Sequence, residues 1–469
     1  MGGIEIRKLL KILGVIIAIL LVCAVAFYFA FLRGLPRPEI ALQPIRFSGM
    51  EQPGQHDCLW MGPVTFEDFN TAYPDGGAIY WPTVFSYPAG EIDSHLEISG
   101  VFPKARYMSL HAYGANAAPY DGLTDMNIVP DVGAENPYVT GTFKPDQGYT
   151  LRVYPRTHPE TAPQNALYLG PLDTLSRTPL ILRNYVSEVQ GDPTGGAGLP
   201  KVALVRANGE RVEDKALCDL LNSPRVGDPE RYIAAPVIPR EDYDQMIRNQ
   251  SVYQRVVKSK NTWTVFWDPK FSVLRLMSPT LEALFRKAAS WDMIAKKSGF
   301  FANFDNEYVS LYINETLGNV TILEGKLPRT PVTGVAGAKV DDYDMRYWSL
   351  CTNEGLATTR YTDCVYDSQV VTDADRNYRI VISKAANRPT NATAECGVTW
   401  LNFGDKGDGA GNEDLSILIL RNMVTNPAFK QAVQSIPRIG AEKATMGDYL
   451  PVPQYTTKEK FEARGCDAS

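Results

Sequence analysis

The stretch that decides the fold is RYMSL at residues 106–110, which returns as RYWSL at residues 346–350, 240 positions later. Three more pairs of segments recur in the same order, 229 to 238 positions apart: Thr124-Asp125 with Thr362-Asp363, YTLRV at 149–153 with YRIVI at 378–382, and LILRN at 180–184 with LILRN at 418–422. A common order at nearly constant spacing is typical of an internal repeat. The sequence therefore predicts two copies of one unit, at about residues 80–186 and 308–424.

The repeated segments have the composition of β-strands. They are rich in the β-branched and aromatic residues that suit a pleated, half-buried surface. Clusters of turn-forming residues at 119–122, 145–148 and 404–409 separate them. Many short strands with turns between them indicate a sandwich or jelly roll. We expect a mainly β protein: two tandem β-sandwich or jelly-roll domains from an internal duplication, joined by a helical segment, behind one N-terminal transmembrane helix.

The connection between the copies has the pattern of helices. Pro279 follows Ser278 as an N-terminal signal, and apolar residues then recur at helical spacing as far as Gly299. Residues 240–258 and 212–222 are two shorter candidates, and we expect all three to pack the sandwiches together. The expected boundaries are a cytoplasmic tail at 1–11, a transmembrane helix at 12–32, a stalk at 33–55, the first domain at 56–210, the helical bridge at 211–300 and the second domain at 301–469.

Residues 12–32 form an unbroken apolar run of 21 residues, which matches the roughly 20 that a helix needs to cross a bilayer. Arg7, Lys8 and Lys11 precede the run, so the positive-inside rule puts the N-terminus in the cytoplasm and the main domain in the periplasm or outside the cell. The alternative is a cleaved signal peptide, because Ala-Val-Ala at 24–26 resembles a cleavage site. Since the apolar run continues past that site, we favour a retained anchor, with the lipid bilayer as a partner.

The cysteines agree with an outer location. Of seven, Cys23 lies in the apolar run, and an even number follows it: Cys58, Cys218, Cys351, Cys364, Cys396 and Cys466. An oxidising compartment permits three disulfides among them, the alternative being buried free thiols. In the repeat, Cys351 aligns with His111 and Cys364 with Met126, and the two cysteines flank a turn as facing positions on a hairpin do. We predict a Cys351–Cys364 disulfide and leave the pairing of the other four open.

Composition and motifs exclude several classes of function. The formal charge of −6 offers no basic excess for a phosphate backbone, so nucleic acid is not an expected partner. Neither a Gly-x-Ser-x-Gly elbow nor a nucleotide-binding glycine loop is present. The acidic, glycine-rich loop at 404–414 does not have the spacing of a calcium loop, and we expect no metal or cofactor. Among four scattered histidines, His111 is the one catalytic candidate, although a buried strand histidine is the simpler interpretation.

Charged residues shared by the two copies are the candidate ligand-binding residues. They are Arg106, Asp125 and Arg183 in the first copy and Arg346, Asp363 and Arg421 in the second. An arginine on an apolar strand needs a partner if it is buried, and a carboxylate matches its planar fork. The simpler interpretation is a structural Arg–Asp pair that fixes a corner of each sandwich. The alternative is that one arginine in each copy faces a cleft and clamps an anionic ligand.

The order of these motifs resembles bacterial envelope proteins of the domain-of-unknown-function 1214 and 1254 types. Residues 346–350 and 418–426 carry most of the likeness, which covers the second copy well and the first loosely. The resemblance implies a β-sandwich or jelly-roll protein of the cell envelope and carries over no catalytic residue. We therefore expect a membrane-anchored, outward-facing protein that binds a ligand or an envelope partner. The alternatives are an envelope hydrolase or lyase acting on carbohydrate or ester substrates in an inter-domain cleft, and a structural subunit of a membrane complex.

Overall fold

The computed structural model shows a mainly β protein. It describes residues 41–46, 58–65, 67, 70–114, 117–171, 178–225, 228–229, 232–248, 262–265, 300–331 and 342–466. No helix among these residues is long and apolar enough to cross a membrane. The predicted transmembrane helix at 12–32 and the predicted bridge helix at 278–299 lie outside the described residues.

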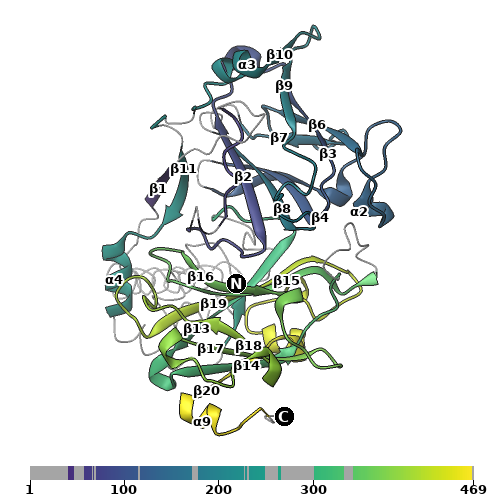
Figure 1. Ribbon diagram of the computed structural model, residues 1–469. Coiled ribbons are helices and arrows are strands. Elements are labelled where there is room, and N and C mark those ends of the chain that lie inside the picture. The colour runs from purple at the N-terminus through teal and green to yellow at the C-terminus, as the bar shows by residue number, and fades with distance from the viewer. Residues whose placement is uncertain are drawn as a thin grey trace, which may run out of the picture.

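The first half of the chain forms two facing sheets (Figure 1). The four-stranded sheet has the order β2 (Ala78–Phe85), β8 (Thr178–Ser187), β4 (Ala105–Tyr113), β5 (Pro119–Thr124). The five-stranded sheet has the order β10 (Arg211–Glu213), β9 (Lys201–Val205), β3 (His95–Val101), β6 (Gly148–Tyr154), β7 (Ala166–Tyr168). All neighbours are antiparallel except β6 and β7, which are parallel.

The second half has the same arrangement. One sheet has the order β12 (Thr264–Val265), β13 (Asn306–Asn314), β19 (Leu415–Thr425), β15 (Met345–Asn353), β16 (Tyr361–Tyr366), and the other has the order β18 (Val398–Asn402), β17 (Asn377–Ser383), β14 (Val320–Lys326), β20 (Val452–Thr456). Strands β17 and β18 are the parallel pair here, as β6 and β7 are in the first half. Each long strand of the first half therefore has a counterpart in the second.

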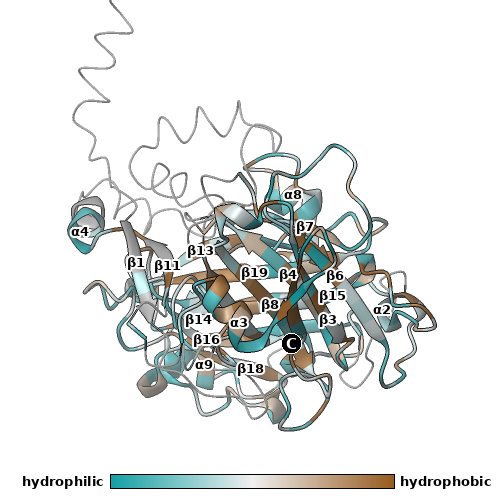
Figure 2. Ribbon diagram, turned by 90° about the horizontal axis from the view of Figure 1, so that it is seen from above, coloured by the Kyte–Doolittle hydropathy of each residue, from teal (hydrophilic) through white to brown (hydrophobic). Residues whose placement is uncertain are grey.

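The four sheets stack in layers, with the β4 and β15 sheets in the middle (Figure 1). Each half has an apolar core between its two sheets, and a third cluster, containing Tyr107, Tyr185, Tyr347 and Met423, lies between the halves. All nine residues of β4 and all nine of β15 are buried, because each strand is covered on both faces. Figure 2 shows the apolar colour on the inner strands β4 and β8, with hydrophilic colour on peripheral loops.

The segments that precede β2 and β13 cross between the halves. The Tyr73 N–H, just before β2, donates to the Thr359 carbonyl of the second half over 2.8 Å. The Phe301 N–H, just before β13, donates to the Ala117 carbonyl of the first half over 3.0 Å. Each half therefore completes its hydrogen bonds with backbone that belongs, by sequence, to the other.

The described part of the region between the halves contains strands as well as helices. Strand β10 extends the first half's sheet to Glu213, beyond the expected boundary at residue 210. Strand β1 (Ala41–Arg46), in the predicted stalk, pairs with β11 (Tyr232–Val237) in the predicted bridge. Two of the expected helices are present, α3 (Asp214–Leu220) and α4 (Arg240–Arg248), and residues 249–258 of the second lie outside the described part of the chain.

We expect the two halves to unfold as one cooperative unit, because the crossed segments lose their partners when either half opens. Native-state hydrogen exchange should give the amides of β8 and β19 the same free energy of opening. Exchange of one half at clearly lower denaturant than the other would contradict this expectation.

Candidate functional site

Two buried ion pairs join the halves, and each takes its arginine from one half and its aspartate from the other. The Arg346 Nη1 atom lies 2.6 Å from Asp125 Oδ1 and 2.8 Å from Oδ2. The Arg106 Nη1 atom pairs with Asp367 Oδ1. The four side chains are at most 3% exposed. Three of the sequence-predicted residues, Arg106, Asp125 and Arg346, are thus brought to the interface between the halves, rather than to a corner within each sandwich.

Asp367, and not Asp363, is the counterpart of Asp125. Asp125 accepts the Met108 N–H over 2.8 Å, and Asp367 accepts the Trp348 N–H over 3.0 Å from the equivalent strand. Asp363 instead accepts the N–H groups of Cys364 and Asn402. The match of Asp363 to Asp125 in the sequence was therefore wrong.

Asp363 does not match Asp125 because the β15–β16 hairpin is longer than the β4–β5 hairpin. His111 lies opposite Gly122 across β4 and β5, whereas Cys351 lies opposite Cys364 across β15 and β16. The second hairpin is therefore two residues longer, which moves its aspartate two positions along the chain. Cys364 is accordingly the counterpart of Gly122 and not of Met126.

Burial raises the pKa of the Asp125 and Asp367 carboxyl groups. The guanidinium groups of Arg346 and Arg106, together with backbone N–H donors, act in the opposite direction on these two pKa values. Each carboxylate is therefore held in a low-dielectric setting by a single cation from the other half.

Arg183 and Arg421 also bind across the interface, in this case to backbone. The Arg183 Nη2 atom donates to the Phe301 carbonyl over 2.7 Å, and Arg421 Nη2 donates to the Tyr73 carbonyl over 2.8 Å. Both side chains are 2% exposed. These arginines hold the crossed segments in place.

A row of tyrosines fills the space between these charged groups. Rings of Tyr107 and Tyr185 meet edge to face with centroids 5.4 Å apart, and those of Tyr185 and Tyr347 with centroids 5.1 Å apart. Burial raises the pKa of all three phenols well above the usual value. The phenols therefore stay protonated at an alkaline pH at which an exposed tyrosine ionises, and the Tyr107 and Tyr347 hydroxyls donate to the carboxylates of Asp305 and Asp75.

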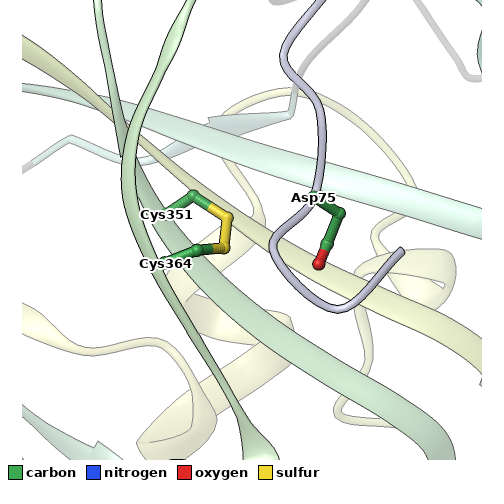
Figure 3. Close-up of side chains that lie close together, drawn as sticks. All are labelled: Asp75, Cys351 and Cys364. Atoms are coloured by element: carbon green, nitrogen blue, oxygen red, sulfur yellow. A yellow bond between two sulfur atoms is a disulfide. The ribbon is translucent and has the colours of Figure 1, made fainter. Parts of the chain in front are cut away.

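Asp75 is the site residue that the sequence did not reveal. Its carboxylate accepts the Tyr347 hydroxyl and the Ser349 hydroxyl, the latter over 2.7 Å, and Arg421 Nε lies 3.5 Å away. Figure 3 shows Asp75 on a loop beside Cys351 and Cys364. Its sequence context, YPDGG at 73–77, indicates only a turn, and it lies before the first recognisable repeat.

Cys351 and Cys364 are joined by a disulfide, and so are Cys58 with Cys218 and Cys396 with Cys466. Because the sulfurs of the first pair are bonded to each other, they do not act with Asp75 as metal ligands. The Arg421 Nη1 atom donates to Cys351 Sγ over 2.8 Å, so this disulfide belongs to the interface network.

His111 is packed inside the interface rather than in a cleft. It is 1% exposed, and its Nε2 atom accepts the Phe304 N–H over 3.3 Å. Gly122 leaves room for the ring, since a Cβ there would lie 2.4 Å from His111 Cδ2. The arrangement favours a structural role for this histidine.

The second half carries a groove of about 730 Å³ on its outer sheet. It is lined by residues from β14, β17 and the C-terminal segment: Glu324, Gly325, Thr372, Asp373, Asn377, Tyr378, Arg379, Cys396, Gly397, Lys443, Asp448 and Cys466. The Cys396–Cys466 disulfide closes a long loop and ties the C-terminal segment to the groove wall.

The groove presents both hydrogen-bond donors and acceptors. The Arg379 Nε atom donates to Glu324 Oε1 over 2.8 Å across the two strands, and Gln454 Nε2 donates to Glu324 Oε2 over 3.2 Å. Hydrogen bonds from Asn377 hold the pKa of Asp373 below its usual value, so that carboxyl is ionised. Three carboxylates and two cations line the groove, which suits a polar ligand of low net charge.

Comparisons with known proteins add little. No family model matches the chain, and no curated protein matches it. A structure of an uncharacterised protein from Burkholderia cenocepacia has a TM-score of 0.40 at 10% identity and covers 80% of each chain. One from Vibrio parahaemolyticus has a TM-score of 0.35 at 11% identity and covers 82% of this chain and 91% of that one. TM-scores of this size do not establish a shared fold or function.

Loss of one interface charge should destabilise the protein strongly. We expect Arg346→Met to lower the free energy of unfolding by about 3–5 kcal/mol, because Asp125 stays buried without its cation. Adding Asp125→Asn should recover part of the loss. The control Lys144→Met removes an exposed pair with Glu135 and should change stability by less than about 1 kcal/mol. Urea unfolding measures all three, and equal losses for Arg346→Met and Lys144→Met would contradict the interface role.

Stability should also fall at alkaline pH. The folded state keeps phenol protons that the unfolded chain releases near pH 10, so it binds more protons and loses stability as pH rises further. Tyr185→Phe should reduce this fall by about 1.4 kcal/mol per pH unit. The exposed Tyr120→Phe should leave the slope unchanged. Urea unfolding between pH 9 and 11, with an alkylating agent against thiol exchange, tests the difference.

Proposed function

We propose that this protein is a membrane-anchored, extracytoplasmic tandem β-sandwich that binds a polar ligand of the cell envelope in the groove of its second half. The observation that carries the proposal is the groove itself, which combines charged and neutral hydrogen-bonding groups on a sheet whose other face is a packed core. A rigid strand support is the usual basis of a preorganised binding surface.

The proposed location rests on two features of the sequence and one of the structure. The apolar run at 12–32 is long enough to span a bilayer, and basic residues precede it. Three disulfides are usual for proteins of an oxidising compartment. The resemblance to the 1214 and 1254 groups stays a prediction.

We also propose that the two halves arose by duplication of one sandwich. The support is the common order of strands and the common register, in which Ser109 faces Arg183 and Ser349 faces Arg421. Positive backbone φ angles also recur at equivalent positions, at Val186 near the end of β8 and at Val424 near the end of β19.

A saccharide suits the groove better than an ion does. Its hydroxyl groups both donate and accept, as the Glu324–Arg379 pair and its neighbours require, and the groove's three carboxylates and two cations leave little net charge to attract an ion.

The detergent-solubilised full chain should bind fragments on an array of bacterial envelope polysaccharides. Arg379→Gln should weaken that binding about tenfold, because a hydrogen bond from a charged group is lost. The matched control Arg211→Gln removes a cross-strand pair with Glu97 in the first half and should leave binding unchanged. Absence of binding to every fragment, or equal effects of the two variants, would refute the proposal.

A hydrolase is the second candidate, and the carboxylates of Glu324, Asp373 and Asp448 in one groove favour it. Glycoside hydrolysis uses two such groups. The test is whether the protein releases reducing ends from a bound fragment. If it does, and if Glu324→Gln abolishes this release, the function of the groove is catalysis rather than binding alone.

A further inference from the structure

Two of the three disulfides lie inside the protein. Cys58 and Cys218 are 3% and 2% exposed. Cys351 is fully buried, and its partner Cys364 is half-buried beneath a loop, because a Cβ at Gly76 would lie 3.6 Å from Cys364 Sγ. A thiol in solution therefore reaches neither bond unless the protein opens locally.

The Cys396–Cys466 disulfide, in contrast, lies at the surface. Cys466 is exposed and Cys396 is half-buried. Both residues line the groove of the second half, which gives a thiolate in solution a route to this bond. Reduction of a disulfide begins with attack of a thiolate on one sulfur, and exposed disulfides are the labile ones. This bond should therefore be reduced before the other two.

Most of the C-terminal segment is held in place without this disulfide. Strand β20 pairs with β14, and helix α9 (Lys458–Glu462) follows at the outer end of this half (Figure 1). Phe461 of α9 is 1% exposed in an apolar cluster on the face of the β14–β17 sheet that points away from the core. The Thr390 N–H donates to Glu462 Oε1 over 2.8 Å. The chain as far as α9 therefore keeps its place when the disulfide opens.

The residues after α9 are held more loosely. Residues 463–466 are exposed, and the Gly465 N–H donates back to the Glu462 carbonyl of α9 itself. At the surface, Asn391 Nδ2 donates to the Gly465 carbonyl over 2.8 Å. The disulfide is the covalent link from this stretch to the groove. A chain end that is not tied down is usually poorly ordered, so reduction frees this stretch.

The other end of the disulfide lies next to the arginine of the groove. Cys396 ends a short 3-10 turn, and Gly397 follows it in the left-handed region with φ +67°. Val398, the first residue of β18, pairs with Arg379 of β17. Cys396, Gly397 and Cys466 thus form one wall of the groove beside Arg379, and the disulfide holds this wall together.

We propose that the Cys396–Cys466 disulfide is a thiol-exchange site that controls the groove. A dithiol opens the bond, and the groove then loses its ordered wall and binds its ligand more weakly, because the wall has to be ordered again on binding. The control of binding rests on the proposed function of the groove. The exchange itself rests on the accessibility of this one disulfide.

The exchange has two steps. A thiolate of the dithiol attacks the exposed Cys466 Sγ, so that a mixed disulfide forms, the Cys396–Cys466 bond breaks, and Cys396 leaves as a thiolate that takes up a proton. The second thiolate of the dithiol then attacks the sulfur of its own mixed disulfide and releases Cys466 in the same way. The dithiol loses two electrons and becomes a disulfide, and the protein disulfide gains them.

The exchange can be tested on the full chain in detergent without any ligand. Graded dithiothreitol, followed by alkylation and peptide mass spectrometry, should label Cys396 and Cys466 at about tenfold less reductant than the other four cysteines. Hydrogen exchange of protein reduced in this way should rise at residues 394–397 and 463–466 and stay unchanged in β17. Equal labelling of the three pairs, or unchanged exchange in the wall, would overturn the proposal.

The control of binding is tested with a polysaccharide fragment that the oxidised protein binds. Selective reduction should weaken this binding about tenfold. The double variant Cys396→Ser, Cys466→Ser should bind as the reduced protein does and should not respond to dithiothreitol, which controls for the two inner disulfides. Selective reduction with unchanged affinity refutes the control and leaves the function of the groove intact. Failure of the oxidised protein to bind any fragment refutes the function and, with it, the control.

Discussion

The structure depends on two buried ion pairs that neither half can form alone. Arg106 finds its carboxylate in Asp367, and Arg346 finds its carboxylate in Asp125, each across the interface. Removing such groups from water costs several kcal/mol per ion, so the pairs contribute little net stability. Their effect is on specificity: a half that packs in another orientation leaves two buried charges without partners.

The same constraint organises the rest of the interface. The crossed segments bring backbone carbonyls to Arg183 and Arg421, and the tyrosines between them stay protonated because they are buried. Each of the four arginines binds a group of the other half, and His111 is enclosed among them. The arginines and Asp125, which the sequence offered as ligand-binding candidates, therefore join the two halves, and the open groove lies elsewhere, on an outer sheet.

The sequence predicted the mainly β fold well because strand composition and turn residues are local signals. It predicted the arginines and Asp125 as a group, since they stand in short repeated motifs. It did not predict which carboxylate pairs with which arginine, because partners such as Arg346 and Asp125 are 221 positions apart. It misaligned Asp363 because a two-residue difference in hairpin length is invisible in a Thr-Asp match. Asp75 stands in a turn without any repeated motif.

The differences between the halves are as informative as their likeness. Where the first half has His111 facing Gly122, the second has a disulfide, and where the second has Asp75, the first has Asn303. The loop hydrogen bond is kept, and the carboxylate stands two residues further on, at Asp305, where the second half has Gly77. Asp305 accepts the Tyr107 hydroxyl as Asp75 accepts that of Tyr347. Each half therefore keeps one carboxylate beside its strand tyrosine, because a buried phenol needs an acceptor wherever the crossed segment can supply one.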